Sequence, residues 1–161
     1  MASEFRMRRR VEFVETDMAG IVHFSNFFRW MEQAEHAFFR SLGFTLHSQS
    51  HDGEAPSEMY GWARVHASCD YDKPLRYQDL FEVHLRVVHK SVATLTFELS
   101  FHRVDTPELS APDEHDGELQ LVARGKMKTC CVSRHGSDPI RAREMPEEIR
   151  AAIEIAAPTN A

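Results

Sequence analysis

Alternation of apolar and polar residues in the second half of the chain restricts its fold most strongly. Four successive segments show this pattern: 62–71, 80–90, 91–104 and 119–132. A two-residue period is typical of antiparallel strands that bury one face and expose the other. We therefore predict four consecutive strands in an antiparallel sheet with one apolar face.

One long helix is predicted ahead of these strands. Ser25 or Asn26 suits its N-cap, and Gly43 stands where a left-handed residue commonly ends a helix. Between these points, large apolar residues recur at steps of three and four, which places them on one stripe of the helix. The stripe contains Phe24, Phe27, Phe28, Met31, Phe38 and Leu42. We expect the sheet to wrap around this helix.

The remaining segments complete a single domain that spans residues 1–161. Loose alternation predicts a first strand over 5–14, and a terminal helix is predicted over 146–156. Residues 45–60 are polar and irregular, which indicates a loop, and the acidic stretch 105–118 is expected at a hairpin tip. An antiparallel sheet around one helix belongs to the α+β class. The chain has no βαβ alternation and no glycine-rich phosphate loop, which argues against nucleotide-binding folds.

Charge and composition narrow the class of protein. A formal net charge of −6 argues against general nucleic-acid binding. The basic N-terminal residues precede no apolar segment, and no run approaches the ~18 apolar residues of a membrane span. We therefore expect a cytoplasmic protein that binds no membrane. The odd count of three cysteines suits reduced thiols rather than a disulfide framework.

No metal site is expected. His47, His51 and Asp52 have the spacing of metal ligands on a helix, but their segment is not predicted to be helical and no further ligand lies at a defined distance. Adjacent Cys130 and Cys131 point to opposite faces of a strand and so cannot easily bind one metal. We expect neither a metal nor an organic cofactor.

Two blocks of sequence carry a family resemblance. Residues 11–43 read VEFVETDMAGIVHFSNFFRWMEQAEHAFFRSLG, and residues 69–83 read CDYDKPLRYQDLFEV, with Gln78 where glycine is usual. In this order and spacing they resemble the 4-hydroxybenzoyl-CoA thioesterase family of the hotdog superfamily. The resemblance implies a homodimer or homotetramer in which two sheets join edge to edge, with the active site between subunits.

Asp17 is the predicted catalytic residue. It lies between a strand and a helix, and thioester hydrolysis needs a carboxylate that attacks the carbonyl or activates water. Gly20 permits close approach of the backbone to a ligand, and the helix start offers free N–H groups. The resemblance implies that the backbone N–H of Phe24 polarises the thioester carbonyl. The alternative is that Asp17 only caps a turn.

Four further residues are candidates for substrate binding. Glu32 matches the acidic helix position that reaches the acyl pocket in the family, and Phe27 is expected to line that pocket. His23 is displaced by one position from the family's histidine, so it either lines the pocket or is an ordinary first-turn residue. Glu35 lies on the apolar stripe, so it either has a partner or a raised pKa, or reaches solvent at a subunit boundary.

Coenzyme A phosphates need cations. Lys90 lies at a predicted turn, and Arg124 and Lys126 share one face of the last strand. These residues are candidates for phosphate binding, although solvated charges on a strand face are more common.

The sequence thus predicts an acyl-CoA thioesterase, with an acyl-carrier protein as a possible alternative carrier. Two other functions stay open: a hotdog protein that binds acyl thioesters without hydrolysing them, and a hotdog dehydratase or hydratase. The intact Thr-Asp-x-x-Gly-Ile-Val motif counts against the first. The second needs a histidine where this chain has Asp17.

Overall fold

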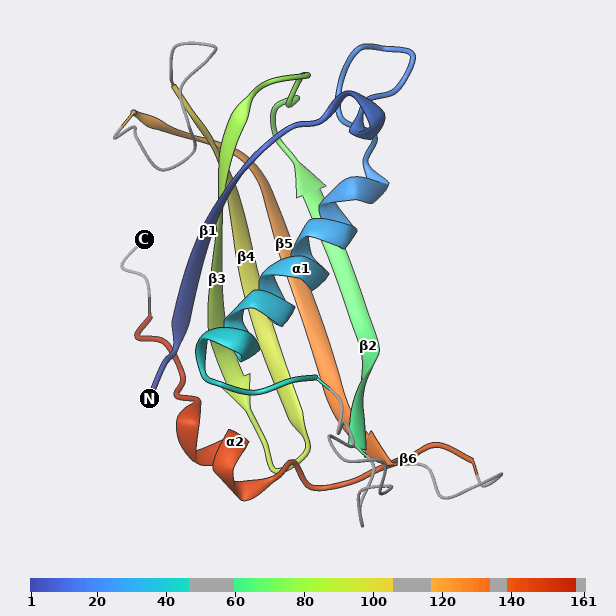
Figure 1. Ribbon diagram of the computed structural model, residues 1–161, viewed down its shortest axis with the longest axis vertical. Helices are drawn as coiled ribbons and strands as arrows, with labels where there is room; N and C mark the ends of the chain where they lie inside the picture. The colour runs from blue at the N-terminus through green and yellow to red at the C-terminus, as the bar shows by residue number, and fades with distance from the viewer. Residues whose placement is uncertain (47–59, 106–116, 134–138, 159–161) are drawn as a thin grey trace.

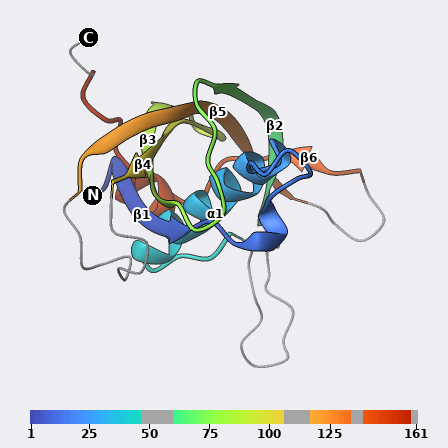
Figure 2. The same ribbon diagram turned by 90° about the horizontal axis from the view of Figure 1, so that it is seen from above.

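Helix α1 lies against the concave face of a curved antiparallel sheet (Figures 1 and 2). The computed structural model describes residues 1–46, 60–105, 117–133 and 139–158. Within these residues the strands are β1 (Glu4–Arg10), β2 (Tyr60–Tyr71), β3 (Leu80–Lys90), β4 (Thr94–Val104), β5 (Leu119–Ser133) and β6 (Arg141–Ala142). The helices are η1, a 3-10 turn (Phe13–Glu15), α1 (Ser25–Ser41) and α2 (Glu147–Ala152).

The sheet confirms the four consecutive strands predicted from alternation. Its order is β1-β3-β4-β5-β2, every neighbouring pair is antiparallel, and β6 pairs with one end of β5. Along β5, Arg124 and Lys126 are exposed while Gly125 and Met127 are buried, as the two-residue period predicts. The sheet therefore has one charged face and one face covered by the helix.

Two predicted boundaries are wrong. The first strand ends at Arg10 rather than residue 14, because the chain turns into η1. The terminal helix stops at Ala152 rather than residue 156, because Ile153 is extended and forms a parallel bridge with Ala2. Among the described residues, no helix has the length and apolar character needed to cross a membrane.

A β-bulge interrupts β2. The pairing register with β5 shifts between Arg64 and His66. The prediction that residues alternate strictly between the buried and the exposed face is therefore wrong at Val65, which is 56% exposed. The extra residue bends the strand and redirects Arg64, which matters for the buried charge described below.

Aromatic side chains join α1 to the sheet. Trp30 packs on Phe81 with ring centroids 4.3 Å apart, and Phe27 packs edge-on against Phe101 at 5.1 Å. Gly125 allows the closest approach, because a Cβ there would lie 2.3 Å from the Sδ of Met31. The core face of α1 consists of Phe27, Trp30, Met31, Ala34, Phe38 and Phe39.

The predicted apolar stripe is largely confirmed, with one exception at its start. Phe24 is 59% exposed rather than buried. It is the N-cap residue, one position before Ser25 and two before Asn26, so the predicted N-cap is wrong. Gly43 ends the helix region with a φ of 82°, as predicted.

Candidate active site

Asp17 opens a tight turn between η1 and α1. The Gly20 N–H donates to the Asp17 carbonyl at 3.0 Å, and Gly20 has a φ of 74°, a value that favours glycine. The Asp17 side chain accepts the Ala19 N–H through Oδ1 at 2.8 Å. Among the described residues no hydrogen bond reaches the second oxygen, Oδ2. Asp17 is exposed, so it both caps the turn and presents one free oxygen to solvent.

The two sides of this turn meet at its base. Thr16 and Val22 form an isolated antiparallel bridge, and the His23 N–H donates to the Glu15 carbonyl at 2.9 Å. The segment that carries Asp17 is therefore hydrogen-bonded to the segment that enters α1. Because His23 directly precedes Phe24, this pairing places the carboxylate and the helix start in one small unit.

The start of α1 has a backbone donor free for a ligand. Within the described residues no hydrogen bond is formed by the Phe24 N–H, while the Phe24 carbonyl accepts from the Tyr71 hydroxyl at 3.3 Å. The His23 ring nitrogen Nδ1 lies 2.8 Å from the Ser25 hydroxyl and accepts the Ser25 N–H at 3.4 Å. His23 thus lies beside the helix start, immediately before the N-cap Phe24, and its role in lining the pocket stays a prediction.

Glu35 is fully buried and has a partner. Its Oε2 accepts from the Arg64 Nη1 at 2.5 Å, and the exposed fraction of its side chain is 0%. Burial raises the pKa of Glu35, and the Arg64 guanidinium opposes part of that rise. The alternative in which Glu35 reaches solvent is wrong. Arg64 was not predicted as a site residue, because the bulge that directs it leaves no clear signal in the sequence.

A small hollow lies beside this pair, on the helix side of β2 and β5. Its volume is about 290 Å³, and Phe28, Met31 and Met127 form its apolar walls. Arg29, Glu32 and Arg64 supply its polar groups, with 3.5 Å between the Glu32 Oε1 and the Arg64 Nη2. The side chain of Glu32 is 58% exposed, so its carboxylate is available to a ligand.

Phe27 lies elsewhere. It is 3% exposed and packs against Trp30, Tyr71 and Phe101 in the core. In this structure it supports the helix rather than lining the hollow.

The three predicted phosphate-binding cations are not brought together. Lys90 donates to the Arg150 and Ile153 carbonyls at 2.9 and 2.5 Å, where it binds the end of α2. Arg124 and Lys126 lie on the sheet face that points away from α1, and Arg124 is paired with Asp72 at 2.6 Å.

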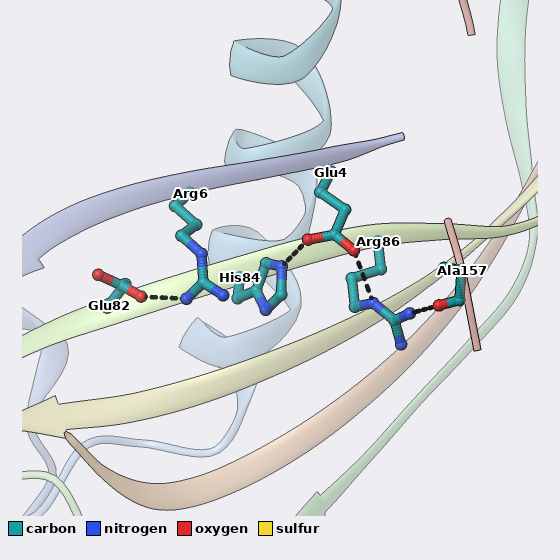
Figure 3. Close-up of polar contacts among 6 residues, drawn as sticks. All are labelled: Glu4, Arg6, Glu82, His84, Arg86 and Ala157. Carbon is teal, nitrogen blue, oxygen red and sulfur yellow. Dashed lines mark hydrogen bonds and ion pairs between the residues drawn. The ribbon is translucent and has the colours of Figure 1, made fainter. Parts of the chain in front are cut away.

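That outer face carries its own ionic network, shown in Figure 3. Glu4 accepts hydrogen bonds from His84 at 2.9 Å and from Arg86 at 3.2 Å. These contacts lower the pKa of Glu4, and the hydrogen bond from His84 has the largest effect. Burial disfavours the charge of Glu82, but hydrogen bonds from Arg6 and Arg8 outweigh burial and lower its pKa. Arg86 also donates to the Ala157 carbonyl, which attaches the C-terminal segment to β3.

Among the described residues no group of three or more His, Cys, Asp or Glu side chains is arranged to hold a metal. His47, His51 and Asp52 lie outside the described residues.

The fold and the turn at Asp17 define a class of protein. The chain belongs to the thioesterase-like superfamily, whose family model matches residues 11–153. It has the hotdog fold and is a thioester hydrolase, which confirms the family resemblance found in the sequence.

Individual proteins that resemble this chain have related names and folds. A protein of Aquifex aeolicus (strain VF5) named "Putative esterase" is 41% identical over 123 residues, which cover 76% of this chain and 88% of that protein. A 1,4-dihydroxy-2-naphthoyl-CoA hydrolase of Prochlorococcus marinus (strain MIT 9303) is 30% identical over 83 residues, or 50% of this chain and 54% of the relative. The structure of the 4-hydroxybenzoyl CoA thioesterase from Pseudomonas sp. strain CBS-3 aligns with a TM-score of 0.73 at 21% identity, covering 94% of this chain and 99% of that chain.

Proposed function

We propose that this protein hydrolyses acyl-CoA thioesters and that Asp17 is its catalytic carboxylate. One observation carries the proposal. A free carboxylate oxygen of Asp17 and a free N–H of Phe24 flank a single short turn whose base is closed by the hydrogen bond from His23 to Glu15. Ester and thioester hydrolysis needs this combination of a nucleophile or base and an oxyanion donor.

In the proposed mechanism the thioester carbonyl carbon is attacked next to the start of α1. Either Asp17 attacks directly and forms an anhydride that water then cleaves, or Asp17 takes a proton from the water that attacks. The Phe24 N–H donates to the developing oxyanion, and one such donor typically lowers the barrier by about 3 to 4 kcal/mol. The coenzyme A thiolate leaves and takes up a proton. Gly20 has no Cβ, so the substrate can pass close to the turn.

The hollow at Glu32 is the proposed acyl site. Its apolar walls suit an aromatic or aliphatic group, and the exposed Glu32 carboxylate can accept a hydrogen bond from a hydroxyl group. The named relatives act on 1,4-dihydroxy-2-naphthoyl-CoA and on 4-hydroxybenzoyl-CoA, whose acyl groups are hydroxylated and aromatic. Hydroxyaromatic thioesters are therefore the first substrates to test, with an acyl-carrier protein thioester as the alternative carrier.

A thiol-release assay tests the proposal. Purified protein should release coenzyme A from at least one member of a panel of hydroxyaromatic, short branched and medium-chain acyl-CoAs. Activity should persist after treatment with a chelator, since no metal takes part in the proposed steps. Binding of the thioesters without thiol release would identify a binding protein. Gain or loss of an alkene without thiol release would identify a hydratase or dehydratase. Loss of activity that zinc restores would contradict the metal-free mechanism.

A further inference from the structure

A largely buried carboxylate, that of Glu15, lies at the base of the Asp17 turn and is not a predicted site residue. The Glu15 side chain is 12% exposed. Its Oε1 accepts from the Trp30 indole N–H at 2.9 Å and from Arg9 at 3.4 Å, and its Oε2 accepts the Glu12 N–H at 2.9 Å. Glu15 therefore joins β1, η1 and α1 through one side chain.

The backbone of Glu15 extends this set of contacts into the site. Its carbonyl accepts two hydrogen bonds, from the His23 N–H at 2.9 Å and from the buried Asn26 side chain at 2.8 Å. Asp17 follows Glu15 by two residues, and Phe24 follows His23 by one. The hydrogen bond from the His23 N–H to the Glu15 carbonyl thus has the proposed carboxylate two residues from one end and the proposed oxyanion donor one residue from the other.

The turn has its own hydrogen bonds, from the Asp17 N–H to the Ile21 carbonyl at 2.9 Å and from the Gly20 N–H to the Asp17 carbonyl at 3.0 Å, but few buried side chains. Met18 is 106% exposed, and Asp17, Ala19 and Gly20 are exposed too. A segment with so few buried contacts takes its position from the residues at its base. Misplacing a reacting group by about 1 Å can cost on the order of 100-fold in rate.

We propose that Glu15 is a positioning residue that, together with Trp30 and Asn26, sets the placement of the Asp17 carboxylate relative to the Phe24 N–H. The inference rests on the proposed thioesterase function, but its structural part can be measured without it. Glu15 does not touch the substrate. It acts by holding both arms of the turn against the first two turns of α1.

Glu15→Gln tests this with little change in shape. The amide keeps one acceptor oxygen but places an N–H donor against either the Glu12 N–H or the Trp30 indole. We expect kcat to fall about 10- to 100-fold, while binding of a non-hydrolysable thioether analogue changes less than about twofold. Amide hydrogen exchange at His23 and Asp17, whose N–H groups are hydrogen-bonded within this unit, should become faster at a temperature where the variant stays folded.

Asn26→Leu is the second variant, because it removes the other donor that orients the Glu15 carbonyl. It should show the same fall in kcat without a matching loss of analogue binding. The double variant should cost less than the product of the two single effects, since both act through one turn. Glu98→Gln makes the same chemical change on the outer sheet face and is the matched control, with activity and exchange expected at wild-type values.

The outcomes separate the positioning role from the function itself. Unchanged kcat in both variants overturns the inference, and so does a fall in kcat that occurs without faster exchange in the turn. A fall in kcat that only tracks the folded fraction also overturns it. If the wild-type protein releases no thiol from any substrate, the proposed function fails, and the exchange at His23 and Asp17 alone decides whether Glu15 positions the turn.

Discussion

At the scale of single residues, Glu35 and Arg64 form the most demanding interaction in the protein. A carboxylate with 0% exposure would be strongly destabilising without the guanidinium at 2.5 Å. Even with that partner, one carboxylate oxygen, Oε1, has no hydrogen-bond partner among the described residues. The balance between desolvation and attraction at this carboxylate thus lies on the side of desolvation, and loss of its partner Arg64 should be costly.

Arg64→Met tests that balance. Removing the guanidinium leaves a buried charge unpaired, so we expect the free energy of unfolding at pH 7 to fall by about 3 to 5 kcal/mol in denaturant titrations. The double variant Glu35→Met and Arg64→Met removes both charges and should recover most of that loss. A single variant as stable as the wild type would contradict a stabilising role for the pair.

The stability of Arg64→Met should also depend on pH. Burial raises the pKa of Glu35, so between its unfolded and folded pKa values the native chain binds more protons than the unfolded chain, and stability falls as pH rises. Without Arg64 that pKa rises further, so lowering the pH from 7 to 5 should restore part of the lost stability of Arg64→Met relative to the wild type.

Glu32 should affect substrate choice rather than chemistry. Glu32→Gln keeps a hydrogen-bonding group but removes the charge. A charge-assisted hydrogen bond to a substrate hydroxyl contributes about 1.5 to 3 kcal/mol, and the substitution weakens it. We expect kcat/KM for a hydroxyaromatic thioester to fall several-fold relative to that for an aliphatic one. Equal changes for the two substrates would place Glu32 outside the acyl site.

Some of these residues could be predicted from the sequence, and others could not, for a physical reason. Asp17 belongs to a contiguous motif, so its place in the turn was predictable from neighbours in the chain. The Glu35 partner depends on a bulge in a strand 29 residues away, and the role of Glu15 depends on a contact with Trp30. Such contacts depend on tertiary structure, which short-range patterns do not specify.

At the scale of elements, the contact between α1 and β5 depends on a glycine. Gly125→Ala would place a Cβ 2.3 Å from the Met31 Sδ, so the buried Met31 side chain must shift, or helix and strand must move apart. We expect a loss of about 1 to 3 kcal/mol in the free energy of unfolding, typical of overpacking. Gly61→Ala in β2 is the control, because nothing lies within 4 Å of its added Cβ. Equal stability of the two variants would mean that α1 is not held closely against β5.

The elements also show what periodicity can specify. Alternation found β3, β4 and β5 because each of them buries residues on one face, and the stripe found α1 for the same reason. The first and last elements were predicted too long, since their ends are set by tertiary contacts: η1 follows β1, and Ile153 pairs with Ala2. The bulge at Val65 was not predicted either, because its position also depends on tertiary contacts and not on the two-residue period.

At the scale of the whole molecule, the two edges of the sheet differ. The β1 edge carries Arg6, Arg8 and Arg9, and charged edges resist pairing with other strands. The β2 edge carries the exposed Val65, and within the described part of the chain β2 pairs with β5 on one side alone. We propose that β2 joins the β2 strand of a second copy, which extends the sheet across a dimer.

Sedimentation at micromolar concentration should therefore show a dimer or tetramer. Val65→Lys puts a charge on the β2 edge and should shift the protein toward monomer, whereas Val92→Lys, at an exposed turn position, should not. A wild-type monomer, or equal effects of the two substitutions, would contradict assembly through β2.

The central claim is that Asp17 carries the chemistry, and Asp17→Asn tests it most directly. The amide keeps the shape of the side chain but can neither attack the thioester nor accept a proton from water. We predict that kcat for thiol release falls by about 10²- to 10⁴-fold, as for loss of a general base, while a non-hydrolysable analogue binds as to the wild type. Retention of more than about a tenth of wild-type turnover, a barrier change of roughly 1.4 kcal/mol or less, would contradict the assignment.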